Sequence, residues 1–84
     1  MKSQREQLLR DLDFLLADLC RDWGFCNRLS AADLISSRSA LRAREFAETV
    51  LRAEKMNPDN EPNWVRRIGE KFSDRFGTSI SLKD

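Results

Sequence analysis

The sequence predicts an all-α fold: a small compact bundle of three principal helices and one short helix, followed by an extended C-terminal tail. Apolar residues recur at helical spacing in several stretches, and residues that start or stop helices bound those stretches. The predicted helices cover residues 4–23, 31–36, 41–55 and 61–76. Since the chain of 84 residues suffices for one core and the connections are short, we expect residues 1–84 to form a single domain.

The first predicted helix carries a stripe of apolar residues spaced three and four positions apart, as on one face of a helix. Its members are Leu8, Leu9, Leu12, Leu15, Leu16, Leu19, Cys20 and Trp23. Gly24 is expected to end the helix, because glycine adopts a left-handed conformation without steric cost. Phe14 lies outside the stripe among charged residues. It is covered by a later segment, is a single exposed apolar residue, or belongs to a partner-binding face.

An apolar turn follows this helix and contains Trp23, Phe25 and Cys26. We expect the two aromatic side chains to fold back onto the domain, and the alternative is an exposed aromatic hook for a partner. Spacing permits a disulfide between Cys20 and Cys26. We nevertheless predict two reduced, mainly packed thiols, because Cys20 lies on the apolar stripe and the context looks intracellular.

Two similar patterns predict the starts of the next helices. In the first, Ser30 can cap the helix, Asp33 lies at its third position, and Leu29 with Leu34 can form a hydrophobic staple. The second start, at 41–46, has a corresponding pair of apolar residues. Its cap is weaker, since Arg42 is a poor capping residue and Ser39 would have to substitute from one turn earlier.

Prolines and Asx residues at 56–62 predict a connector, with Pro62 in the first turn of the last helix. The last helix is expected to end at Gly77. Its apolar face is expected to pack on the leucine stripe through Trp64, Ile68 and Phe72. In the tail, residues 78–82 alternate like a strand. With no second strand predicted, Ile80 and Leu82 are expected to dock on the core or to fray.

Composition argues against several classes of function. Fifteen basic and fourteen acidic residues nearly cancel, so no overall field attracts nucleic acid or a membrane. Histidine is absent and no phosphate loop or nucleophile motif is present, so we expect neither an enzyme nor a cofactor. Two cysteines without histidine cannot supply the four ligands of a structural zinc site, and no metal is expected. The N-terminus does not resemble a signal peptide and no stretch could span a membrane, which predicts a cytoplasmic chain.

Two kinds of partner are left by these exclusions. A protein partner, or a second copy of the chain, would bind through Phe14, Trp23 and Phe25, or through part of the leucine stripe that short helices leave uncovered. A nucleic acid or another phosphorylated ligand would bind through the basic stretch 28–44. Its arginines are Arg28, Arg38, Arg42 and Arg44, and it is rich in serine.

We predict a non-catalytic protein-interaction module, an adaptor or a self-associating domain, with nucleic-acid or phosphate binding as the alternative. A helix-turn-helix made of residues 31–36 and 41–55 would support the alternative. Glu45 and Glu48 on the second of these helices oppose it, because they would repel phosphates.

Overall fold

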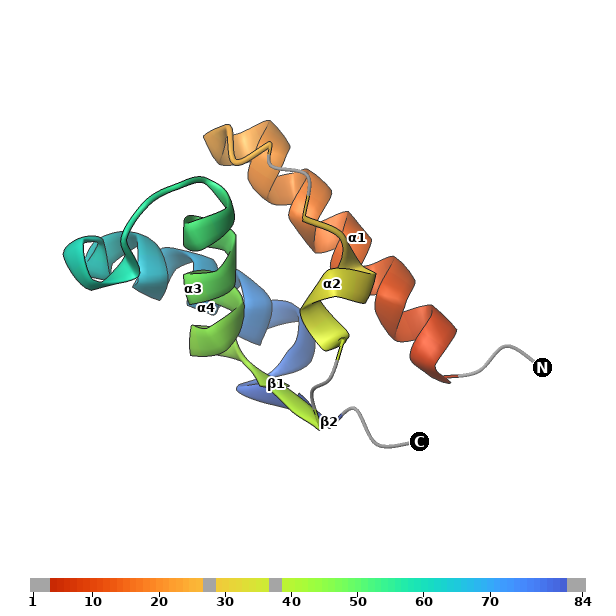
Figure 1. Cartoon of the computed structure of the whole chain (residues 1–84). Helices are drawn as coiled ribbons and strands as arrows, with labels where there is room; N and C mark the ends of the chain where they lie inside the picture. Colours follow the sequence, from red (N-terminus) through yellow and green to blue (C-terminus); the bar gives the residue numbers. More distant parts are fainter. Residues whose placement is uncertain (1–3, 27–28, 37–38, 82–84) are drawn as a thin grey trace.

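The computed structural model describes residues 4–26, 29–36 and 39–81, and most of them lie in helices, as the sequence predicts (Figure 1). In chain order the α-helices are α1 (Gln4–Trp23), α2 (Ala31–Ile35), α3 (Ala43–Ala53) and α4 (Pro62–Phe76). Helix α1 forms one side of the molecule, with α2 packed beside it. Helices α3 and α4 pack together on the other side of the core. The predicted class, a small compact helical fold, is confirmed.

Both glycines predicted to end helices do so. The backbone of Gly24 has a φ of 76°, and its N–H donates to the carbonyl of Cys20 at 3.0 Å. The backbone of Gly77 has a φ of 84°, and its N–H donates to the carbonyl of Ser73 at 2.8 Å. A residue with a Cβ is disfavoured in this left-handed region, so these positions determine where α1 and α4 stop.

The start of α2 is capped as predicted and is also tied to α1. The Ser30 hydroxyl accepts from the backbone N–H of Asp33 at 3.2 Å, and the Asp33 carboxylate accepts from the backbone N–H of Ser30 at 3.3 Å. In addition, the carboxylate of Asp13 on α1 accepts from the backbone N–H of Ala31 at 3.1 Å. A short helix that would be marginal alone is thereby anchored to the longest helix.

Two predictions are wrong because a small sheet forms: the third helix does not start at residue 41, and the tail is not unpaired. Strand β1 (Ala40–Arg42) pairs in antiparallel fashion with β2 (Ser79–Ser81), and Leu41 lies opposite Ile80. Pairing satisfies backbone groups that an isolated tail would leave to water, and Leu41 is fully buried. Ile80 is half-buried against the core, whereas Leu82 lies outside the described residues.

Helix α3 therefore begins two residues later than predicted. Arg42 occupies the N-cap position without a side-chain cap, and the tail supplies a backbone contact in place of the expected serine cap. The N–H of Ala43 donates to the carbonyl of Thr78 at 3.0 Å. Between α3 and α4, the predicted connector contains the 3-10 turn η1 (Pro58–Asn60), where the Asn57 side chain accepts from the backbone N–H of Asp59 at 3.0 Å.

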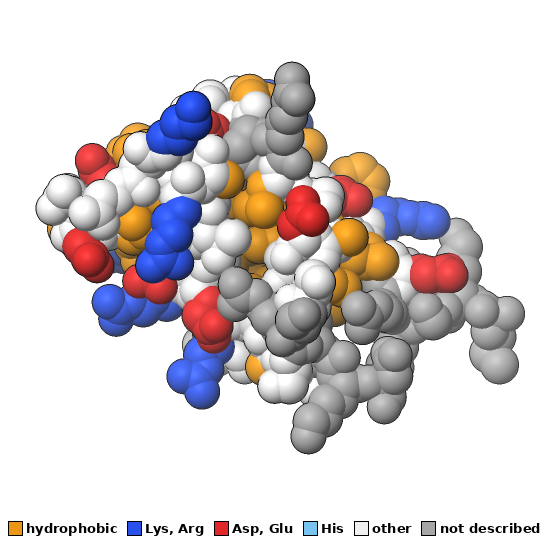
Figure 2. Space-filling view, in the orientation of Figure 1, with side chains coloured by type: hydrophobic (Ala, Val, Ile, Leu, Met, Phe, Trp, Pro, Cys, Tyr) orange, Lys and Arg blue, Asp and Glu red, His pale blue; other side chains and the backbone are white. Residues whose placement is uncertain are grey.

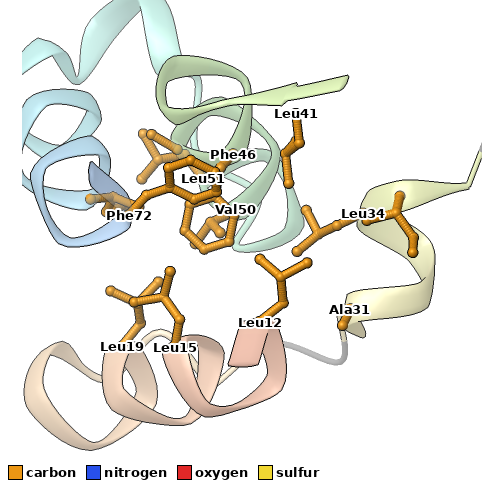
Figure 3. Close-up of a cluster of buried hydrophobic side chains, with 13 residues drawn as sticks. Leu12, Leu15, Leu19, Ala31, Leu34, Leu41, Phe46, Val50, Leu51 and Phe72 are labelled. Atoms are coloured by element: carbon orange, nitrogen blue, oxygen red, sulfur yellow. The ribbon is translucent and has the colours of Figure 1, made fainter. Parts of the chain in front are cut away.

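The core lies between α1 on one side and α3 with α4 on the other (Figure 3). Phe72 is at its centre, with ring centroids 5.1 Å from both Phe46 and Phe76. The middle of the leucine stripe, Leu12, Leu15 and Leu19, is buried, whereas Leu8, Leu9 and Leu16 are only partly buried, so a partner contact through part of the stripe stays a prediction. The buried hydrophobic residues are Leu12, Leu15, Leu19, Ala31, Leu34, Ile35, Leu41, Phe46, Ala47, Val50, Leu51, Ile68 and Phe72.

Candidate functional site

The aromatic residues after α1 fold back onto the domain. Trp23 and Phe25 contact Trp64 of α4, with centroid distances of 5.3 and 4.9 Å, and lie 6.4 Å from each other. All three are half-buried and have edge-to-face geometry. We call these three residues the aromatic cluster. Trp64 thus packs on the end of α1 and the turn after it, while Ile68 and Phe72 join the leucine stripe in the core as predicted.

Cys20 and Cys26 form a disulfide, so the prediction of two reduced thiols is wrong. The reason is the left-handed turn at Gly24, which folds the chain back along the last turn of α1. The N–H of Phe25 donates to the carbonyl of Leu19 at 3.3 Å. This brings the two cysteine Cα atoms to 4.4 Å, within the range that a disulfide can bridge.

Ion pairs join α1 to α4 beside the aromatic cluster. Lys71 Nζ donates to the Asp22 carboxylate at 2.6 Å and lies 4.8 Å from the centroid of the Trp23 ring. Arg75 donates to the Asp18 carboxylate at 3.4 Å. The hydrogen bond from Lys71, followed by the one from Arg21, lowers the pKa of the Asp22 carboxyl below its ordinary value of 3.8. These side chains are engaged within the domain.

Phe14 is the one large hydrophobic side chain that is exposed in the described part of the chain, at 57%. It lies on the outer face of α1, and of the three explanations considered for it, coverage by a later segment is wrong. An isolated exposed apolar residue is ordinary in folded proteins. Its exposure makes it available to a partner.

The predicted phosphate-binding arginines are not brought together as a free basic cluster among the described residues. Arg28 and Arg38 lie outside those residues. Arg42 lies 4.0 Å from Glu45, and Arg44 lies 3.5 Å from Glu48, each within α3 or at its start. On the face shown in Figure 2, basic and acidic side chains are interspersed without a patch of one sign.

The two helices that the phosphate-binding alternative would combine into a helix-turn-helix each pack mainly on another helix. Strand β1 separates α2 from α3 in the chain. Helix α2 packs mainly on α1, and α3 packs mainly on α4. This packing does not support the alternative of a helix-turn-helix made of residues 31–36 and 41–55, and phosphate binding stays a prediction.

A groove of about 520 Å³ runs between α3 and α4, and we call it the α3–α4 groove. Along α4 its lining residues are spaced three or four apart, or adjacent, so they form one stripe that spans three turns, about 16 Å. From α4 these are Pro62, Val65, Arg66, Gly69, Glu70 and Ser73. Opposite them lie Ala43, Arg44 and Glu48 of α3, with Pro58 and Asp59 of η1 at the connector.

Two small residues, Gly69 and Ala43, lie where the two helices meet at the groove. Gly69 is buried, and a Cβ built on it would lie 3.7 Å from the carbonyl oxygen of Ala43. With so little side-chain volume at this crossing, the longer side chains beside it stand apart as a rim. Arg66 and Glu70 form the rim on α4, while Arg44 and Glu48 form the rim on α3.

The sequence-based prediction missed this groove. The apolar face of α4 was expected to face the core and its charges to face solvent, and no groove was predicted at the glycine within this amphipathic helix. Glycine within a helix is unfavourable and often indicates close packing. Gly69 on α4 together with Ala43 on α3 was the available signal.

The described residues contain no group of three or more histidine, cysteine, aspartate or glutamate side chains placed to hold a metal ion. In the same part of the chain, no helix is long and apolar enough to cross a membrane. Comparison with protein-family models, with curated proteins and with solved structures gives no significant match.

Proposed function

We propose that the chain is a non-catalytic protein-interaction module whose partner docks in the α3–α4 groove. The observation that carries the proposal is a groove with an apolar floor and a rim of both charges on the surface of a small domain. Burial of apolar surface is the main favourable term in protein association. Rim charges contribute to orientation and selectivity.

The shape of the groove favours a helical or extended segment of a partner protein. Two helices form its walls, and its stripe on α4 spans three turns. Amphipathic helices bind in such grooves through side chains spaced three and four apart. The rim carries Arg44 and Arg66 against Glu48, Glu70 and Asp59, so a polyanion such as nucleic acid would meet repulsion as well as attraction.

The test is affinity capture from the native host with a rim-reversed variant, Arg66→Glu combined with Glu70→Lys. Both side chains are exposed, so the variant is expected to fold normally. The matched control is Arg52→Glu, which changes an exposed residue of α3 outside the groove. We expect one specific protein to be retained by the native chain and by the control, and to be lost from the rim-reversed variant.

Each capture is run with and without nuclease. Equal retention by the native chain and the rim-reversed variant would contradict docking in the groove. Loss of the retained material on nuclease treatment would instead favour the phosphate hypothesis, and Arg42→Ala and Arg44→Ala would then be the variants to compare.

We also propose, from the sequence, that the chain is cytoplasmic. The Cys20–Cys26 disulfide opposes it, because cytosolic thiols are kept reduced. Alkylation of free thiols at the moment of lysis, followed by mass measurement of the chain, decides between a reducing and an oxidising compartment. Two alkylated cysteines would support a reducing compartment, and none would support an oxidising one.

A further inference from the structure

We propose that the partner in the α3–α4 groove is a second copy of this chain, which inserts Phe14 between α3 and α4 of its neighbour. This inference rests on the proposed function, because it names the occupant of the same groove. It joins two features that the fold leaves unused, an exposed aromatic side chain on α1 and an apolar groove that α1 does not line.

The protruding side of the contact is the outer face of α1. Phe14 is 57% exposed there, and Ala17 on the next turn is also exposed and small, so it does not screen the ring. Helix α1 forms one side of the molecule (Figure 1), and Leu12, Leu15 and Leu19 point from it into the core (Figure 3), so the opposite face of the helix is turned outward. A neighbouring molecule can therefore reach the ring without displacing any described part of the chain.

The receiving side offers apolar contacts of the right kind. Pro62 and Val65 lie along α4, and Ala43 of α3 lies across from Gly69, one turn beyond Val65. The groove volume of about 520 Å³ accommodates an aromatic ring together with part of the helix that carries it. Aromatic rings that enter such apolar pockets are typical anchors of protein interfaces.

Charges on the two surfaces are complementary. On α1, Arg10 and Asp11 lie one turn before Phe14, and on the groove rim Arg66 and Glu70 lie one turn apart. None of these four residues takes part in an ion pair within the described ranges; Asp11 accepts only from the Gln7 amide, at 3.2 Å. A neighbour oriented with Arg10 toward Glu70 and Asp11 toward Arg66 satisfies both pairs.

Such a contact is head-to-tail, because the inserted residue and the groove are different surfaces of the same molecule. A head-to-tail contact leaves one groove and one Phe14 free in a dimer, so assembly continues into rings or open chains. The expected state is a population whose mean mass exceeds that of a dimer and rises with concentration.

The experiment uses two variants that each remove one side. Phe14→Ala keeps the groove, and Ser73→Trp fills the groove while keeping Phe14. Arg52→Ala and Ala53→Trp are the matched controls, since they change exposed residues at the end of α3 that do not line the groove. Sedimentation equilibrium measures mean mass against concentration for each chain alone and for an equimolar mixture of the two variants.

We expect each one-sided variant to stay monomeric where the native chain associates, with the association constant lowered about tenfold or more. Their mixture should form a heterodimer and stop there, because only one groove and one Phe14 remain. A native chain that is monomeric at all concentrations overturns the inference. So does a symmetric dimer, which Phe14→Ala would disrupt and Ser73→Trp would not.

A folding check keeps the outcome interpretable. If Ser73→Trp unfolds, as judged by circular dichroism, the rim-reversed variant replaces it in the mixture. The failure of this inference is distinguishable from that of the proposed function. A monomeric native chain that still loses its captured protein when the rim is reversed would retain the groove as a docking site and exclude only self-association.

Discussion

Helix α4 is held to α1 and to α3 in different ways. Against α1 it uses large and charged side chains: the aromatic cluster, and the ion pairs that Lys71 and Arg75 make with α1. Against α3 it uses a close approach at Gly69 and Ala43, with Phe46 and Phe72 beneath. The first contact leaves a hollow of about 470 Å³, but it is lined mainly by charged residues, of which Asp18, Lys71 and Arg75 are already held in ion pairs. The second leaves a groove that Ala43, Pro58, Pro62 and Val65 line with apolar surface, which is why we place function on the α3 side.

The largest effect is expected from Trp64→Ala, which removes the centre of the aromatic cluster. Trp64 contacts both Trp23 and Phe25, and truncation of a large packed aromatic side chain costs about 3 kcal/mol. Urea unfolding measures the loss. The control is Arg67→Ala, whose guanidinium lies 5.5 Å from the Trp64 ring and is exposed, so its loss costs less than about 1 kcal/mol. Equal effects of the two changes would mean that the cluster does not hold α4 to α1.

The next effect concerns the disulfide. Replacing both Cys20 and Cys26 by serine is expected to lower the free energy of unfolding by about 2 kcal/mol, because the bond closes a short loop in the unfolded chain. A reductant should produce the same loss in the native chain. It should have no effect on the doubly substituted variant. Unchanged stability of the native chain under reductant would contradict a stabilising cross-link.

Much of the fold was predictable because its signals are local. Helix caps act over one turn, so Ser30 with Asp33, and Gly24 and Gly77, located helix ends from the sequence alone. The sheet was not predictable in this way. Its three-residue strands are separated in the chain by the whole of α3 and α4. No residue near Leu41 in the sequence predicts that Ile80 lies opposite it.

The candidate site was less predictable than the fold, because a groove is a property of two packed helices. The charges at 44 and 48 and at 66 and 70 looked like ordinary solvated faces, and only the crossing at Gly69 turns them into a rim. From the sequence, exposure of the Phe14 side chain was only one of several possibilities, because a later segment could have covered it. The disulfide was missed because the backbone turn that aligns the cysteines outweighs the argument from compartment.

A smaller effect on the free energy of unfolding is expected when alanine replaces a glycine at each contact. Gly69 lies at the contact of α4 with α3, and Gly24 lies at the end of α1, beside the aromatic cluster. At Gly69→Ala the added methyl group meets Ala43 at 3.7 Å, ordinary contact distance, and alanine is the better helix former. We expect stabilisation of up to about 1 kcal/mol. At Gly24→Ala, where φ is 76°, we expect destabilisation of about 1 kcal/mol. Thermal unfolding measures both, and destabilisation at Gly69 would mean that the helices are closer than this contact implies.

The smallest effect is a pH dependence at the contact between α1 and α4, which comes from Asp22. The pKa of the Asp22 carboxyl is lowered by its hydrogen bonds to Lys71 and Arg21. The folded chain therefore binds that proton less tightly than the unfolded chain. The resulting stability is present above the ordinary value of 3.8 and is lost as the pH falls through the lowered pKa.

Asp22→Asn should accordingly be slightly less stable than the native chain at neutral pH, and the difference should vanish under strongly acidic conditions. Urea unfolding at several pH values measures it. Glu70→Gln is the matched control, because that rim carboxylate makes no ion pair in the described part of the chain. A difference between Asp22→Asn and the native chain that stays constant across pH would show that Asp22 acts as a hydrogen-bonding group rather than as a charge. The α1 contact would then depend on the aromatic cluster and the disulfide, with no contribution from the Lys71–Asp22 charge pair.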